Sequence, residues 1–484
     1  MGLNREFLVN IILLVVINLL IKPLYLFGID ARVQNIVGTE NFGLYFALFN
    51  FIFLFQVIND PGIQNFNSRF IAQDPDKIIF HFPRILGSKV LLGLIFIIIT
   101  TLAGFLIGYD LSELKILALI AVNFFLATLF IYLRTNISAL GMYRKDSYIS
   151  AIDKLIMIII LGYLTWFYPD LESFTIYWFI YGQMIAYTIA CIVAFAIVLP
   201  KVKEGWIVFS WSYMLKLVKK SAPFALVILL VAIYLRIDGV MLERLLDDNG
   251  LQAGIYAAAY RFFEAAGMLA YLFGALLLPM YSALMGKKES VASLTLTSLK
   301  MILVISMTIL VTLVVYRHDV MTFIYDDATT YYGKILIYMM LAFFAVAISH
   351  IYGAMIMAKG SLKELNIIFI LGAILNVSLN LWLIPLKGAE GAAIATVATQ
   401  LLVTISQICL AHSQMKLQIN YSLIAKSIVF GFLCTLSAIL WHNSGLYWTI
   451  SMALSILFCL GISLLLGVVD KNMLSTLQKQ NAES

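Results

Sequence analysis

The chain has 484 residues, of which 62% are apolar and only 12% are charged, with a formal net charge of +6 and a mean hydropathy of +0.98. A soluble domain is about 45–50% apolar and about 25% charged, so this composition excludes a soluble protein and indicates an all-α polytopic membrane protein. The positive charge is explained by membrane topology, and no nucleic-acid partner is expected.

Apolar windows long enough to cross a bilayer recur along the whole chain. A hydrocarbon core of about 30 Å takes about 20 helical residues. We predict fourteen such windows, and we interpret the first as a retained span because Lys22 and Pro23 interrupt it and it has no small-residue cleavage site. The windows are 7–28, 41–60, 80–107, 112–137, 147–167, 174–199, 221–246, 250–283, 294–316, 331–358, 364–385, 388–412, 420–441 and 447–469.

The loops between these windows alternate in charge. Loops that stay in the cytoplasm are enriched in Lys and Arg. The even-numbered loops are basic, whereas the odd-numbered loops 109–113, 168–173, 246–250 and 325–330 are short and acidic. Both termini are therefore predicted to be cytoplasmic. The cations assigned to the first two even loops are Arg69, Lys77, Arg84, Lys89, Arg134, Arg144, Lys145 and Lys154.

The longest polar break, residues 200–220, separates six windows from the rest. Two interpretations of it stay open: Trp206 and Trp211 hold it at the membrane surface, or it is a solvated connector. The predicted domains are an N-terminal six-helix lobe (1–200), a cytoplasmic basic linker (201–220), a C-terminal six-helix lobe (221–412), and two additional helices with a cytoplasmic tail (413–484).

A short internal repeat favours two matching lobes. Residues 41–49 ("NFGLYFALF") and 252–260 ("QAGIYAAAY") share the pattern Gly-x-Tyr-x-Ala-x-aromatic and are displaced by 211 residues. Six windows separate them, so both segments have the same orientation. This arrangement predicts a parallel repeat about an axis along the membrane normal, with a transport site near the midplane between the lobes.

Charged residues inside the apolar windows are the main indication of a site. A charge at the centre of a spanning helix costs about 2.5–3.5 kcal/mol, so such residues normally face a cavity or one another. Asp238 lies roughly 13 Å from the outer end of its window and Arg261 roughly 16 Å into the next. Lys22, Arg236 and Arg261 are predicted to form a cationic cluster in a central cavity, with Glu264 on the same helix face as Arg261. The alternative is a structural set of salt bridges among Arg236, Asp238, Arg261 and Glu264.

Uncharged polar residues near the start of the chain have two possible roles. They either line the cavity or join helices by hydrogen bonds; they are Asn18, Asn50, Gln56 and Asn59. In the following turn, Asp60 is predicted to cap backbone N–H groups and Arg69 to act as a gate.

A second constellation suits a cation. Asn376 and Asn380 share one helix face because they are four residues apart, and Thr396 lies in the next window. Together with Asp238 they offer oxygen ligands from three helices, a set that suits a hard cation such as Na⁺. The alternative is hydrogen bonding between helices. No cofactor is expected beyond this coupling ion.

Three segments resemble a known family. They are "VQNIVGTENFGLYFALFNF" (33–51), "LRIDGVML…AGIYAAAYRFFEA…LLLPMYSAL" (235–284) and "PLKGAEGAAIATVAT" (385–399). They resemble the polysaccharide-flippase branch, including the O-antigen type, of the multidrug/oligosaccharidyl-lipid/polysaccharide exporter superfamily. The resemblance covers nearly the whole chain.

The resemblance implies a substrate and roles for several residues. It implies two six-helix lobes in a V, two additional C-terminal helices, and transfer of undecaprenyl-pyrophosphate-linked oligosaccharide across a bacterial inner membrane by alternating access. Arg261 lies where related lipid II flippases keep a cavity Arg, and Lys22 falls near another of their Arg residues. Asp238, Asn376 and Thr396 match their Na⁺ ligands, whereas Asn380 replaces an Asp, so the site has one formal negative charge instead of two.

Two other functions remain open. One is a cation-coupled multidrug antiporter of the same fold, although mid-membrane cations suit an anionic cargo better. The other is a membrane polysaccharide polymerase or glycosyltransferase, although the longest outer loop, 317–330, offers few catalytic groups. We therefore expect a transporter rather than an enzyme, with lipid-linked oligosaccharide and membrane lipids as partners, and a polymerase and glycosyltransferases as functional neighbours.

Overall fold

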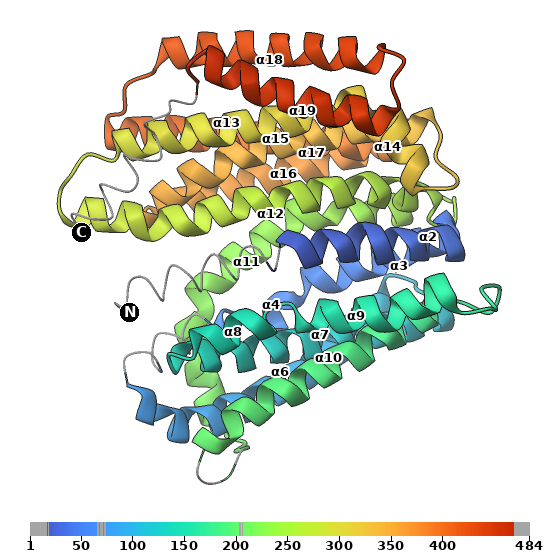
Figure 1. Cartoon of the computed structure of the whole chain (residues 1–484). Coiled ribbons are helices and arrows are strands. Elements are labelled where there is room, and N and C mark those ends of the chain that lie inside the picture. The colour runs from blue at the N-terminus through green and yellow to red at the C-terminus, as the bar shows by residue number, and fades with distance from the viewer. Residues whose placement is uncertain are drawn as a thin grey trace. The chain divides into compact units, whose positions relative to one another are not determined.

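The computed structural model describes residues 17, 19–64, 67, 71, 74–202, 205 and 207–468, and all regular elements in this part of the chain are helices (Figure 1). The predicted all-α fold is thereby confirmed. The chain divides into two compact units, Met1–Ala257 and Ala258–Ser484, and each is described by itself. The predicted domains divide the chain according to its internal repeat, whereas these units divide it according to internal contacts. The predicted domain boundaries therefore stay a prediction.

The first unit contains two π-helical turns, η1 (Leu26–Asp30) and η3 (Tyr163–Phe167). Such turns are rare and frequently occur at functional sites. Its other elements are α2 (Ala31–Val37), α3 (Thr39–Leu54), α4 (Gln56–Asn59), η2 (Pro75–Lys77), α6 (Ile78–Leu106), α7 (Leu111–Ala139), α8 (Tyr143–Ile149), α9 (Ile152–Gly162), α10 (Ile176–Val198), η4 (Leu199–Lys201), α11 (Trp211–Leu245) and the start of α12 (Leu251–Gly286).

The second unit continues α12 and adds seven helices. They are α13 (Ala292–Val315), α14 (Arg317–Ile324), α15 (Thr330–Lys359), α16 (Leu362–Lys387), α17 (Ala389–Met415), α18 (Tyr421–His442) and α19 (Trp448–Leu465).

The helices agree with the predicted spans. Among the described residues, 11 helical segments are long and apolar enough to cross a membrane, and each overlaps one predicted window, with ends that differ by up to a few residues. Of the other three windows, 7–28 lies partly outside the described residues, 41–60 is folded largely as α3 and α4, and 221–246 lies in the 35-residue α11 except for its last residue.

The basic break after α10 packs against the first unit. The Val208 N–H donates to the Pro83 carbonyl at 2.9 Å, and a Cβ on Gly87 would clash with the Val208 carbonyl. The backbone at Val208 therefore lies directly on α6. Side chains on both flanks join the apolar core of the unit; they are Val202, Met214 and Leu217. The solvated-connector interpretation is therefore wrong for these residues.

The second half of the break is helical. The Ser210 hydroxyl caps α11 by accepting the Tyr213 N–H at 3.3 Å, and the helix runs unbroken from Trp211 to Leu245. Residues 211–220 thus extend the seventh predicted span. Trp211 is exposed, as a surface anchor would be, and Trp206 lies outside the described residues.

Glycines allow α3 to approach the turn between α11 and α12 at backbone distance. A Cβ on Gly43 would clash with the carbonyl oxygen of Gly250, and it would lie 2.6 Å from the Gly254 nitrogen. Gly250 has φ +87°, a conformation that favours glycine. The Gln34 side-chain amide also donates to the Gly254 carbonyl at 3.1 Å. The two segments of the internal repeat therefore contact each other at Gly43 and Gly254.

In the second unit, polar and aromatic contacts attach the two C-terminal helices to the rest. The hydroxyls of Tyr316 and Ser455 are 3.0 Å apart, and the His442 Nε2 atom lies 3.0 Å from Asp319 Oδ2. The Phe323 and Trp448 rings meet edge to face, with centroids 5.4 Å apart. These contacts join α19 and the end of α18 to the region around α14.

Candidate functional site

The charged residues of α11 contact neighbouring helices of the first unit. Asp238 is 1% exposed, and its Oδ2 accepts a hydrogen bond from the Tyr256 hydroxyl at 2.7 Å. The Arg236 guanidinium lies 4.8 Å from the ring centroid of Phe53 and 5.9 Å from that of Phe49. Because aromatic rings attract cations through their faces, Arg236 is held against α3. Sequence reasoning found both charges but missed Tyr256 and the two phenylalanines.

Asn50 lies beside this part of α11. A Cβ on Gly239 would clash with the Asn50 amide nitrogen, so the amide occupies the space that the missing side chain leaves. Asn50 is buried, yet neither its Nδ2 nor its Oδ1 has a hydrogen-bond partner in the protein. A buried amide without partners normally binds water or a ligand. Asn50 is thus a candidate contact for a polar group next to Asp238, whereas its predicted place on a cavity wall stays a prediction.

Arg261 is the corresponding buried cation of the second unit. It is 3% exposed, and its Nη1 donates to the Tyr325 hydroxyl at 2.9 Å. That hydroxyl in turn donates to the Ala258 carbonyl at 3.2 Å. Tyr325 directly follows α14, so the loop after α14 positions the guanidinium. Glu264, one turn along α12, is partly exposed.

The predicted amide residues on α16 lie together. Asn376 and Asn380 are both fully buried, and the Asn380 Nδ2 donates to the Asn376 Oδ1 at 3.1 Å. The Thr396 hydroxyl donates to the Ala392 carbonyl at 3.0 Å. Thr399, one turn further, has a buried hydroxyl without a hydrogen-bond partner, and the sequence analysis did not single it out.

Four further residues that the sequence singled out belong to the N-terminal part of the chain. Lys22 lies in a helix just before η1 and is partly exposed. Asn59 donates to the Phe124 carbonyl at 3.3 Å, which agrees with the helix-joining alternative for this residue. Asn18 and Arg69 lie outside the described residues.

A buried ion pair is present where the sequence analysis placed a loop cation. Lys89 is completely buried in α6, and its Nζ lies 3.0 Å from Asp60 Oδ2. The assignment of Lys89 to a basic loop is therefore wrong. Asp60 also accepts hydrogen bonds from the backbone N–H groups of Gly62 and Ile63 at 3.0 and 2.8 Å, as predicted, and one from Gln64 Nε2 at 2.6 Å. The pair thus fixes the turn after α4 to α6.

Lys154, assigned to the next basic loop, also lies in a helix, α9, and its side chain is 20% exposed. Its Nζ lies 3.2 Å from the Tyr187 hydroxyl, 3.7 Å from Asp153 Oδ2 and 4.6 Å from the Tyr25 ring centroid. Next to this group, the Gln183 amide donates to the hydroxyls of Tyr25 and Tyr45, both at 3.1 Å. A polar network therefore runs through the first unit. One indication of it was present in the sequence, because Lys154 lies inside the predicted window 147–167.

The turn between α6 and α7 is bound to the end of α11. The Tyr109 hydroxyl donates to Glu243 Oε2 at 3.0 Å, and the Arg244 guanidinium lies 3.9 Å from the Tyr109 ring centroid. Burial, together with the negative charge of Glu243, raises the pKa of the Tyr109 phenol, so it remains a neutral donor.

These contacts bring some predicted residues together and leave others as predictions. Arg236, Asp238 and Asn50 surround the α3–α11 contact, and Asn376 contacts Asn380 within α16. Two predicted groups remain predictions. One is the cluster of basic side chains that joins Arg236 to Lys22 and Arg261. The other is the set of Na⁺ ligands that joins Asp238 to Asn376, Asn380 and Thr396. No group of three or more His, Cys, Asp and Glu side chains suited to a metal occurs in the described part of the chain.

Buried charges and amides among many spanning helices are typical of membrane transporters. The sequence profile of a family described as polysaccharide biosynthesis protein matches residues 7–285, more than half of the chain. The chain therefore belongs to the polysaccharide biosynthesis protein family, as the resemblance of its three segments predicted. A comparison with curated proteins gives no match.

Solved structures of transporters share the fold. The chain is similar to lipid II flippase MurJ in an inward closed conformation, with 15% identity and a TM-score of 0.71 over 91% of this chain and 96% of that one. It is also similar to an outward-facing multidrug resistance MATE family transporter of the MOP superfamily, with 12% identity and a TM-score of 0.58 over 84% and 95%. A MOP superfamily transporter from Pyrococcus furiosus gives 13% identity and 0.58 over 84% and 95%.

Proposed function

We propose that this transporter flips undecaprenyl-pyrophosphate-linked oligosaccharide across the bacterial inner membrane for surface polysaccharide synthesis, by alternating access. The family supports a role in polysaccharide biosynthesis, and the similarity in fold to a lipid II flippase supports transfer of a lipid-linked cargo. The observation that carries the proposal is Arg261, a buried guanidinium within a helix that is apolar and long enough to span a membrane.

Arg261 suits a pyrophosphate for a physical reason. A lipid pyrophosphate is strongly anionic, and an unpaired anion is very costly within a hydrocarbon layer. A guanidinium has five N–H donors in a fork that matches phosphate oxygens, and such charge-assisted hydrogen bonds are strong. Tyr325 uses the Nη1 donor to orient the group. We propose that Lys22 and Arg236 add positive charge, with Glu264 next to Arg261, and that Asn50 and Asn18 contact the polar cargo.

We further propose that Na⁺ drives transport, with Asp238, Asn376, Asn380 and Thr396 as ligands. The chemistry of this set fits, because carboxylate, amide and hydroxyl oxygens suit a hard cation. The amide of Asn380 donates to Asn376 Oδ1, and the second lone pair of that oxygen is the one that an ion would use. Replacing Asp238 with Asn is expected to make transport independent of a Na⁺ gradient, measured in vesicles with and without the gradient. Unchanged Na⁺ dependence would contradict the proposed site.

The proposed orientation has both termini in the cytoplasm of a bacterial cell, because the remaining basic loops would then lie inside. Glycosyltransferases on that side would supply the cargo, and a polymerase on the other side would consume it. Cysteine labelling with a membrane-impermeant reagent tests this orientation: Lys287→Cys is expected to be protected in intact cells, and Asp327→Cys to react.

An Arg261→Ala variant tests the proposed function. In a host whose surface polymer depends on this gene, the variant is expected to abolish the polymer and to leave lipid-linked oligosaccharide on the cytoplasmic face, at unchanged protein level. Arg317→Ala is the matched control, because Arg317 is an exposed arginine of the same unit. Normal polymer with Arg261→Ala would contradict the role of the guanidinium. Resistance to drugs that depends on the protein, without any effect on polymer, would instead favour the multidrug antiporter.

A further inference from the structure

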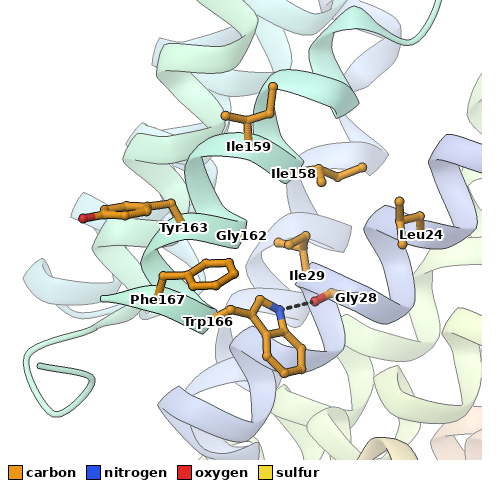
Figure 2. A pocket seen from close by; sticks show the side chains of 9 residues that line it. All are labelled: Leu24, Gly28, Ile29, Ile158, Ile159, Gly162, Tyr163, Trp166 and Phe167. Carbon is orange, nitrogen blue, oxygen red and sulfur yellow. Dashed lines mark hydrogen bonds between the residues drawn. The ribbon is translucent and has the colours of Figure 1, made fainter. Parts of the chain in front are cut away.

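An apolar groove with a volume of about 510 Å³ lies on the first unit, between residues 24–29 and the segment formed by α9 and η3 (Figure 2). Leu24 and Ile29 form one wall, and Ile158, Ile159 and Phe167 line the other. The volume falls within the range of about 300–1,000 Å³ that is typical of small-molecule sites. The groove is therefore large enough for part of a ligand.

Two glycines create this space. A Cβ on Gly162 would meet only Ile29 Cδ1, at 3.4 Å, and a Cβ on Gly28 only Leu24 Cδ1, at 3.6 Å. The positions beside both glycines are therefore open, unlike those of Gly43. Gly28 lies within η1, and Gly162 directly precedes η3, so each wall contains one of the two π-helical turns.

The groove belongs to a candidate membrane span. It lies on Tyr143–Phe167, a segment apolar and long enough to span a membrane. Ile159 is 68% exposed and Phe167 77%, so acyl chains rather than neighbouring helices would cover them. Tyr163 and Trp166 lie at the end of this span, and such residues are enriched at the level of the lipid head groups. The groove thus runs inward from the head-group region.

A cation lies at the polar end of the groove. The Trp166 indole N–H donates to the Gly28 carbonyl at 3.1 Å (Figure 2), and the Arg32 guanidinium lies 4.8 Å from the Trp166 ring centroid. Trp166, which lines the groove, therefore lies between Gly28 and the Arg32 guanidinium.

We propose that the groove binds an acyl chain of an anionic phospholipid, whose phosphate lies near Arg32. The apolar walls accommodate the chain, and the guanidinium attracts the head group. One cation near anionic lipid corresponds to an about fivefold preference over a zwitterionic lipid. The polyprenyl tail of the cargo is the less suitable occupant. Lys22, which we propose to lie near the pyrophosphate of the cargo, is two residues from Leu24 in the groove wall, and side chains two residues apart do not face the same side of a helix. This binding does not depend on the proposed transport function.

Fluorescence quenching by brominated lipid tests occupation of the groove. The full chain is reconstituted with phosphatidylglycerol that carries brominated acyl chains, and its tryptophan emission is compared with that in the unbrominated lipid. Subtracting the spectra of a Trp166→Phe variant isolates Trp166. Trp166 is 58% exposed, so surrounding lipid also quenches it. Its emission is expected to fall in the brominated lipid, and the fall is expected to be smaller in Gly162→Leu, which fills the groove, than in the wild type. Gly461→Leu is the matched control, because a Cβ at Gly461 meets nothing within 4 Å. Equal emission in both lipids would overturn the proposal.

Native mass spectrometry tests the choice of lipid. Wild-type protein exposed to equal phosphatidylglycerol and phosphatidylethanolamine is expected to retain about five times more of the former, and Arg32→Gln about equal amounts. This comparison stands even where Gly162→Leu fails to fold. Three results would overturn the proposal. The wild type retains both lipids equally, it retains added undecaprenyl phosphate in their place, or it has the mass of a dimer without lipid.

Discussion

Replacing Lys89 with Met removes the charge of the buried ion pair and keeps an apolar side chain of similar length. Breaking one partner of a buried pair costs about 3–5 kcal/mol. Asp60 retains its three other donors, on Gly62, Ile63 and Gln64, so we expect the low end, about 3 kcal/mol. A domain of 150–250 residues loses about 2–4 °C per kcal/mol, which corresponds here to a fall in Tm of about 6–12 °C.

The assay is thermal unfolding of the purified protein, followed by tryptophan fluorescence. Lys287→Met is the control because Lys287 is exposed, and its Tm is expected to equal that of the wild type. The double variant Lys89→Met/Asp60→Asn no longer buries an unpaired carboxylate and is expected to regain part of the loss, whereas independent effects would add. If Lys89→Met unfolds at the same temperature as Lys287→Met, the pair does not stabilise the unit and the reasoning is refuted.

Other substitutions give distinct outcomes. Gly43→Val is expected to abolish folded protein, measured by size-exclusion chromatography, because its Cβ would clash with the Gly250 backbone. Tyr325→Phe removes the hydroxyl that accepts from Arg261, and is expected to lower stability by about 1–3 kcal/mol and to reduce polymer output less than Arg261→Ala does. Hydrogen bonds from the start of α7 lower the pKa of Asp110, so its ionised form stabilises the fold above its ordinary pKa. The Tm advantage over an Asp110→Asn variant is expected to vanish as the pH falls through that lowered pKa.

The sequence was sufficient to predict the helices but not all of their limits. Long apolar windows fold as helices because no other structure satisfies backbone groups within a bilayer. The start of α11 was missed because three lysines, Lys216, Lys219 and Lys220, make it look like a loop. Charge does not prevent a helix, however, and the apolar side chains of Met214 and Leu217 pack into the core.

The candidate site was predicted in its residues but not in its contacts. Asp238 and Arg261 stood out because a charge is rare in an apolar window. Their partners Tyr256 and Tyr325 have no such signal, since tyrosines are common in this chain. Lys89 was misassigned because its partner Asp60 is 29 residues away, and pairing across that distance depends on tertiary packing rather than on local pattern.

The contact between Gly43 and Gly254 has a consequence for how such a chain can evolve. The two residues are displaced by the interval of the predicted internal repeat, in which they are counterparts. Copies related by a two-fold rotation touch at like residues only where the rotation axis passes. In an ancestral dimer of identical six-helix chains, one mutation at this glycine would therefore have introduced two side chains into a gap that has no room for one. Fusion of the copies into one chain would let the two positions change independently. Even then, a Cβ on either glycine would displace the backbone of the segment that carries the other.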